Sequence, residues 1–334
     1  MLPEFGGETK VKDYILKSNF KEDITKFLEL KHLLSYKYIL GQKLIEQFDN
    51  FCFSKYPDEN ILTEEIALDW ATPRKNESAS SVANRIITVR QFAKFLNASY
   101  KNAFVIPGRY IPKKPKYNSY IYSNIELQRI FDVIDNKKFR CYHKNSYIVF
   151  PLLFRVFYCC GLRISEILSL KVKHIDLENG IIAVYESKNN DNRLVVLSDE
   201  LKERSKQYYN QMHKNSNNDD YFFYTKNKEK AIVETTLRKS FRQILKLADI
   251  EKCKENNPRI HDFRHTYAVH CLKKFVNEDK DLYAYLPILK TYMGHSKFRS
   301  TEYYLKLTND MYPDILKKTN SYINEAIPRI GGAL

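Results

Sequence analysis

Four short segments in the second half of the chain carry side chains suited to chemistry on a phosphate ester. The first is Gly161-Leu162-Arg163-Ile164-Ser165-Glu166, where Arg163 and Glu166 lie three residues apart and share a helix face. Such a pair is usually a surface ion pair that contributes little to stability. An arginine held in place by a carboxylate can instead grip a phosphate with two parallel hydrogen bonds. Taken alone, the segment favours the ion pair.

The second segment is the polar turn 188–192, which begins with Lys188 and lies between two expected strands. A lysine on a polar turn is most often only solvated. At a hairpin tip, however, its ammonium group can enter a DNA groove and donate a proton to a departing alkoxide.

The third segment, His261-Asp262-Phe263-Arg264-His265, places His261 and Arg264 on one side of a helix. Helix capping and exposed charge are a fair alternative explanation. The same pair also meets the needs of phosphoryl transfer, because arginine stabilises added negative charge and histidine moves a proton near neutral pH.

The fourth segment is Met293-Gly294-His295-Ser296, followed by Thr301-Glu302-Tyr303-Tyr304. Gly294 fits the C-cap of a helix, and both tyrosines fit a hydrophobic core. The chain has 25 tyrosines, so no single one stands out as a nucleophile.

The elements that must position these segments form a mainly α-helical protein with one small antiparallel sheet. Ser123 and Glu126 predict a capping box at the start of a helix that runs to Asp135. A second helix is expected over 147–160, with Gly161 at its end. Period-two stretches over 181–185 and 194–197 predict two strands, and Asn179-Gly180 predicts a hairpin turn.

The first third of the chain is predicted to be wholly helical, and basic residues mark both it and the segment that follows. A helix over 81–97 has one apolar face, while Arg85, Arg90 and Lys94 point elsewhere. Prolines then interrupt the helical pattern over 107–119, which we take as a linker between domains. These basic side chains are either solvated or in contact with a DNA backbone; those of the linker are Arg109, Lys113, Lys114 and Lys116.

The charge of the chain favours a polyanionic partner. Lys and Arg number 55 against 40 Asp and Glu, a net charge of +15, and neutralised phosphates release condensed counterions. The six cysteines form no C-x-x-C pair, which is typical of a reduced, cytosolic protein without a bound metal. No stretch is apolar and long enough to predict a membrane span, and we expect no cofactor.

Together, the order and spacing of the four segments resemble the tyrosine recombinase (phage integrase) family. Its G-L-R-x-x-E segment is matched by 161–166, and its lysine ahead of an Arg-Leu-Val strand by Lys188 and 193–195. Its H-x-x-R-H motif is matched by 261–265. Its L-G-H-S segment is matched by 293–296, with Met293 in place of leucine, and Tyr304 follows His295 by nine residues. The catalytic resemblance covers residues 123–318.

This resemblance implies a catalytic role for each matched residue. Tyr304 would attack a DNA phosphodiester and form a 3′-phosphotyrosyl enzyme. The phosphate would be held by Arg163, Arg264 and His295. Lys188 would protonate the departing 5′ oxygen, His261 would act on the tyrosine proton or support the phosphate, and Glu166 would orient the basic cluster. Rejoining would need neither ATP nor metal, because the phosphotyrosyl bond conserves the energy of the phosphodiester.

The resemblance also implies an organisation and partners. We expect a helical core-binding domain that clamps DNA over 1–106, the linker over 107–119, and a catalytic domain over 120–334 with a tail helix over 313–326. The partners would be double-stranded DNA with specific recombination sites and further copies of the chain, four on two duplexes. A bacterial, cytoplasmic, nucleoid-associated protein of a mobile genetic element fits this hypothesis.

Three other functions stay open. A type IB topoisomerase-like enzyme would use the same chemistry without a partner duplex. A non-catalytic DNA-binding accessory protein is a different class, and the presence of all six candidate catalytic residues argues against it. A metal-dependent nuclease is disfavoured, because the sequence shows no convincing constellation of acidic ligands.

Overall fold

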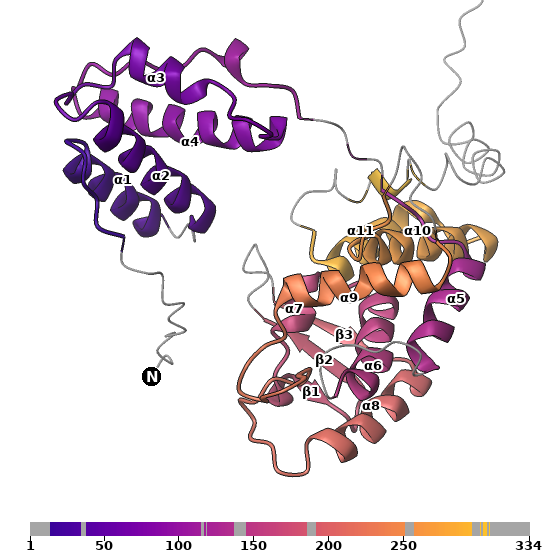
Figure 1. Cartoon of the computed structure of the whole chain (residues 1–334). Coiled ribbons are helices and arrows are strands. Elements are labelled where there is room, and N and C mark those ends of the chain that lie inside the picture. The colour runs from indigo at the N-terminus through magenta and orange to yellow at the C-terminus, as the bar shows by residue number, and fades with distance from the viewer. Residues whose placement is uncertain are drawn as a thin grey trace, which may run out of the picture. The chain divides into compact units, whose positions relative to one another are not determined.

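The computed structural model describes residues 14–34, 38–114, 117, 119–136, 145–185, 192–250, 257–295, 301, 303–305 and 307. The chain divides into two compact units, Met1–Tyr117 and Asn118–Leu334 (Figure 1). The division falls within the basic, proline-containing segment 107–119. Lys116, Lys188 and the predicted tail helix lie outside the described residues. In the described part of the chain, no helix is both long and apolar enough to cross a membrane.

The described part of the first unit is helical. It contains α1 (Lys21–Leu33), α2 (Ile39–Lys55), α3 (Glu64–Ala71), α4 (Ala79–Ala98) and the 3-10 turn η1 (Gly108–Tyr110). Hydroxyl groups start two of these helices: Thr63 accepts a hydrogen bond from the amide of Ile66, and Ser78 from that of Ser81. Aromatic rings fill the core between the helices, among them Phe20, Phe27, Phe48, Trp70 and Phe92.

The sequence predicts that Arg85 lies on a basic, outward face of α4, and the structure shows that this prediction is wrong. Only 2% of this residue is exposed. Its Nε and Nη2 atoms each donate to a carboxylate oxygen of Glu77 at 2.7 Å, and its guanidinium also donates to the carbonyls of Trp70 and Thr72. Arg85 therefore belongs to the interior of the first unit and is no longer a candidate DNA contact. Arg90 is half-buried, and Lys94, Arg109, Lys113 and Lys114 are exposed.

The second unit is mainly helical around a small antiparallel sheet, as the sequence predicts. Its elements are α5 (Asn124–Asp135), α6 (Ser146–Cys159), α7 (Ile164–Leu168), η2 (Val172–His174), β1 (Ile175–Asp176), β2 (Ile181–Val184), β3 (Arg193–Val196), α8 (Asp199–Met212), α9 (Glu234–Leu247), α10 (Asp262–Asn277) and α11 (Leu282–Met293). The strand order is β1-β2-β3. Helix α6 packs against α5, α8 and α10, and β3 lies against α11 (Figure 1).

Local sequence signals explain how several of these elements begin and end. The capping box of Ser123 and Glu126 is confirmed at the start of α5. The turn at Asn179-Gly180 joins β2 to the two-residue strand β1, which was too short for its sequence to predict. Gly161 ends α6 with a φ of +56°, and a Cβ there would lie 2.5 Å from the ring of Tyr267. The chain turns at this glycine, so that Arg163 becomes the N-cap residue of α7.

Candidate active site

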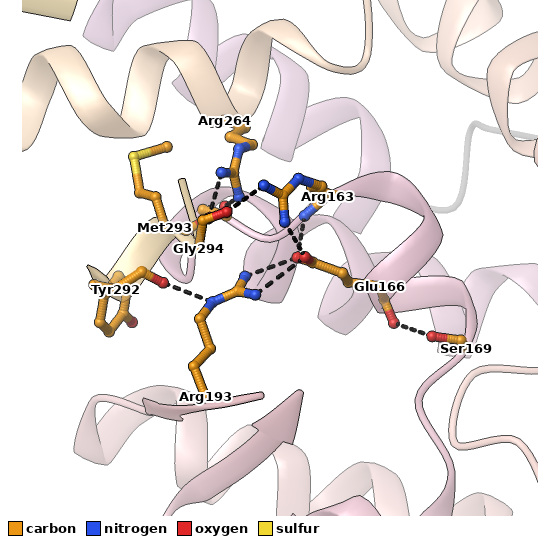
Figure 2. Close-up of polar contacts among 9 residues, drawn as sticks. Arg163, Glu166, Ser169, Arg193, Arg264, Tyr292, Met293 and Gly294 are labelled. Carbon is orange, nitrogen blue, oxygen red and sulfur yellow. Dashed lines mark hydrogen bonds and ion pairs between the residues drawn. The ribbon is translucent and has the colours of Figure 1, made fainter. Parts of the chain in front are cut away.

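Side chains from the start of α7, from β3 and from α10 meet the backbone carbonyls at the end of α11 beside Glu166 (Figure 2). Glu166 is 4% exposed, and both of its carboxylate oxygens accept hydrogen bonds from two arginines. Arg163 donates from its backbone amide at 2.8 Å and from Nη1 at 2.6 Å. Arg193 donates from Nη1 at 3.0 Å and from Nη2 at 2.7 Å. Burial raises the pKa of Glu166, but these hydrogen bonds and charges outweigh it and lower the pKa to about 2, so the group is ionised at neutral pH.

Three arginines also close the C-terminal end of α11. Arg193 donates from Nε to the carbonyl of Tyr292 at 2.7 Å, Arg264 donates to the carbonyl of Met293, and Arg163 donates to that of Gly294 (Figure 2). The last carbonyls of a helix have no partner within the helix, and this end of the helix dipole attracts cations. Each of three consecutive carbonyls thus fixes a different guanidinium group.

Among the described residues, the arginine cluster carries more positive charge than its one carboxylate neutralises. Arg163 and Arg193 bond to Glu166, and Arg264 adds a third guanidinium that bonds to carbonyls, so three positive charges face one negative charge in the described part of the site. Arg264 is 2% exposed and also donates to the carbonyl of Gly161. Burial, with a contribution from Arg163, lowers the pKa of Arg264 to about 10. Such a cluster suits an anion with several oxygens, such as a phosphate.

Tyr304 lies in this cluster, in the same chain. The residue is 3% exposed, and its hydroxyl is 3.0 Å from Nδ1 of His265. Burial raises the pKa of Tyr304, while the charge and a hydrogen bond of Arg264 and the charge of Arg163 act in the opposite direction. Its ring stacks on that of His295, with 5.6 Å between centroids. Tyr303 differs, because its hydroxyl is bonded to Ser119, donating to the side-chain oxygen at 3.2 Å.

The histidines around Tyr304 are held in the neutral form. Burial, together with the nearby arginines and, for His265, the neighbouring histidines, lowers the pKa of His261 to about 4 and the pKa values of His265 and His295 to about 3. Nδ1 of His295 lies 3.0 Å from the hydroxyl of the fully buried Thr301. The ring of His261 lies 5.0 Å from that of His265. Neutral imidazoles beside a phenol can accept its proton.

The structure brings together Arg163, Glu166, Arg264, His295 and Tyr304, and places His261 next to His265 at the edge of this group. His261 is the N-cap residue of α10 and not part of the helix, whose first turn carries Arg264. Lys188 lies outside the described residues. Three residues of the site received no role from the sequence: Arg193, His265 and Thr301. His265 stands in the H-x-x-R-H motif and Thr301 lies three residues before Tyr304, whereas Arg193 gave only the signal of a strand start.

A basic pocket of about 990 Å³ lies beside α9, in the same unit as this cluster. It is lined by α9 and by the segment that leads into α10, with Arg238, Arg242, Lys246 and Arg259 among its residues. The charge of Arg238, one of the lining residues, contributes to the low pKa of His261.

Known proteins resemble this chain along most of its length. The sequence model of the phage integrase family matches residues 122–311. A putative integrase/recombinase, y4rB of Sinorhizobium fredii, is 24% identical over 90% of this chain and 97% of that protein. The tyrosine recombinase XerA of Saccharolobus solfataricus is 27% identical over 76% of this chain and 73% of that protein. In fold, the Tn1549 transposon integrase in complex with circular intermediate DNA matches with a TM-score of 0.59 at 16% identity, over 85% of this chain and 93% of that one.

Proposed function

The chain belongs to the phage integrase family of tyrosine recombinases, which are enzymes that cleave and rejoin DNA, and we propose that it does so at specific sites through a covalent bond to Tyr304. The observation that carries this proposal is the position of the Tyr304 hydroxyl. It lies 3.0 Å from a neutral histidine and within the field of Arg264 and Arg163. A phenol needs both a proton acceptor and nearby positive charge to attack a phosphate near neutral pH.

In the first step, Arg163 and Arg264 bind the non-bridging oxygens of the scissile phosphate. A guanidinium has five N–H donors, more than the described contacts to carbonyls and Glu166 use. His295 adds a hydrogen bond, and Thr301 fixes the orientation of its ring. The proton of Tyr304 passes to His265, which the geometry favours over His261 for this step, and His261 supports the phosphate.

As the Tyr304 oxygen bonds to the phosphorus, the bond from phosphorus to the 5′ oxygen breaks and Lys188 protonates this leaving oxygen, a role that rests on the sequence match alone. The DNA is then held as a 3′-phosphotyrosyl ester of Tyr304. A 5′ hydroxyl of the partner duplex attacks this ester, releases the tyrosine and completes the strand exchange. Glu166 keeps the arginines in place throughout.

Each of the two units would contribute contacts to the DNA. In the second unit, the basic pocket beside α9 would bind phosphates of the bound duplex. The first unit would act as the core-binding domain, with Arg90, Lys94, Arg109, Lys113, Lys114 and Lys116 as the proposed backbone contacts. Four copies on two duplexes would form the recombining complex, and the host element would be a transposon or another mobile genetic element.

The test is to recover the DNA that becomes attached to the protein. Wild-type protein and its Tyr304→Phe and Tyr303→Phe variants are incubated with fragmented host genomic DNA in EDTA, denatured, and the attached ends are sequenced. We expect adducts with one shared sequence for wild type and Tyr303→Phe, and none for Tyr304→Phe. Adducts at unrelated sequences would favour the topoisomerase-like activity, and their absence from wild type would contradict the proposal.

A further inference from the structure

Arg193, the first residue of β3, connects the sheet to the active site through a buried side chain. Its side chain is 6% exposed, against 19% for that of Arg163. All three nitrogens of its guanidinium donate to protein groups: Nη1 and Nη2 to the two oxygens of Glu166, and Nε to the carbonyl of Tyr292 (Figure 2). Arg193 therefore joins three elements, β3, α7 and the end of α11, and every nitrogen of its guanidinium is bonded to one of them.

The bonds of Arg193 set the position of groups that the proposed reaction uses. Glu166 receives Arg193 on one side and Arg163 on the other, so the carboxylate is shared between them. Without Arg193, Glu166 would be free to turn toward Arg163 alone and draw its guanidinium away from the carbonyl of Gly294. The end of α11 would also lose the donor to Tyr292, three residues before His295.

The backbone around Gly294 is fitted to the guanidinium of Arg193. Gly294 has a φ of +63°, and a Cβ on it would lie 2.8 Å from Nη1 of Arg193. The guanidinium of Arg193 thus packs against the backbone of the residue that precedes His295. A displacement of about 1 Å in such an arrangement can lower a reaction rate by about 100-fold.

We propose that Arg193 is a positioning residue for DNA cleavage, which aligns Arg163 through Glu166 and His295 through the end of α11, without touching the phosphate itself. This inference rests on the proposed function of the same site. It separates the arginines into two kinds: Arg163 and Arg264 bind the substrate, and Arg193 holds the carboxylate that orders them.

The experiment measures single-turnover formation of the covalent adduct over a range of DNA concentrations. The probe is a nicked duplex with the sequence that the wild-type protein attaches to. The variants are Arg193→Gln, Glu166→Gln, the double variant, and Arg193→Lys, which keeps the charge but cannot serve Glu166 and Tyr292 together. Arg155→Gln is the matched control, because Arg155 of α6 also binds a carboxylate, Asp135, with two nitrogens and a backbone carbonyl, that of Pro151.

We expect Arg193→Gln to lower the maximal rate by about 10- to 100-fold, with the half-saturating DNA concentration changed less than about twofold. Arg193→Lys should keep the circular dichroism spectrum of the wild type, and its maximal rate should fall about 10-fold. The double variant is no slower than the slower single variant, because both act through one contact. The rate of Arg155→Gln stays near that of wild type.

Maximal rates of Arg193→Gln and Arg193→Lys within about twofold of wild type would overturn the inference, as would multiplying losses in the double variant or a loss confined to DNA affinity. If the wild-type protein formed no adduct, the proposed function would fail instead. A normal wild-type adduct with an unaffected Arg193→Gln variant would leave the proposed function standing and remove only the role of Arg193.

Discussion

Each unit of the molecule contains a glutamate bound by arginine, half-buried Glu77 in the first and buried Glu166 in the second, and the two clusters differ in charge balance. In the first unit, one guanidinium, that of Arg85, bonds to Glu77, which also accepts from the backbone amide of Arg74, and the other donors of Arg85 bond to the carbonyls of Trp70 and Thr72. In the second unit, Glu166 faces two arginines directly, and Arg264 adds a third positive charge at the end of α11. Arginine lowers the carboxylate pKa in both units, so this pKa alone does not distinguish them.

The charge balance indicates which cluster serves structure and which serves function. An ion pair in which all three guanidinium nitrogens also bond to protein groups is complete within the fold. Surplus positive charge around a buried phenol is costly unless an anion enters to complete it. The comparison therefore predicts opposite outcomes when an arginine is removed from each cluster.

The largest effect is expected at Arg163. Replacing it with Met removes a phosphate donor, so the rate of adduct formation should fall about 100- to 1,000-fold. The free energy of unfolding should change little, because the variant removes one surplus positive charge while Arg193 still bonds to both oxygens of Glu166. Single-turnover cleavage and urea unfolding measure the two effects. Strong destabilisation with normal cleavage by the folded fraction would reverse the assignment of the clusters.

Arg85→Met should show the opposite pattern. It leaves the half-buried Glu77 without its guanidinium partner, with only the backbone amide of Arg74 still bonded, which costs up to about 3 kcal/mol of the free energy of unfolding. The only tryptophan of the chain, Trp70, packs on Arg85 with 4.8 Å from its ring centroid to Cζ, so its fluorescence reports this unit during urea unfolding. The added change Glu77→Gln should restore part of the loss. An unchanged unfolding midpoint would show that the pair is dispensable.

The pH dependence of stability should separate the two units. His261, His265 and His295 have folded-state pKa values of about 3 to 4, below the unfolded value of about 6.5. Their contribution is complete above pH 6.5 and is lost as the pH falls toward 4, because only the unfolded chain takes up protons. Each such proton costs about 1.4 kcal/mol per pH unit.

Unfolding at pH 7, 6 and 5 tests this difference. Circular dichroism should show a falling midpoint for the second unit, while the Trp70 signal of the first unit changes little. In the first unit, the pKa of Glu77 is lowered, so its contribution weakens only once the pH falls below about 4.5. Equal shifts of both signals would contradict the electrostatic difference between the units.

The smallest effect is expected on the surface of the first unit. Lys94→Gln should reduce the slope of log affinity against log salt by about one, with the maximal cleavage rate unchanged. Lys26→Gln on α1 is the matched control, since Lys26 is also exposed and is not a proposed contact. The same change of slope in both variants would indicate general attraction to DNA without a defined contact.

The sequence correctly predicted the features that depend only on residues close together in the chain. The capping box at Ser123, the turn at Gly161 and the hairpin around Gly180 follow from backbone preferences of nearby residues, and all are confirmed. Arg85 was mispredicted because its position on α4 does not show that Glu77, eight residues earlier, meets its guanidinium. Arg193 gained no role for the same reason: its partners, Glu166 and Tyr292, are distant in the chain and meet it only in the folded unit.

The most direct test of the central claim identifies the atom that carries the DNA. The denatured adduct is digested with nuclease and trypsin, and the modified peptide is fragmented in a mass spectrometer. Residues 300–306 form one tryptic peptide with both Tyr303 and Tyr304. We predict a 3′-phosphonucleotide on Tyr304, whereas the nucleotide on Tyr303 or on any other residue would contradict this account.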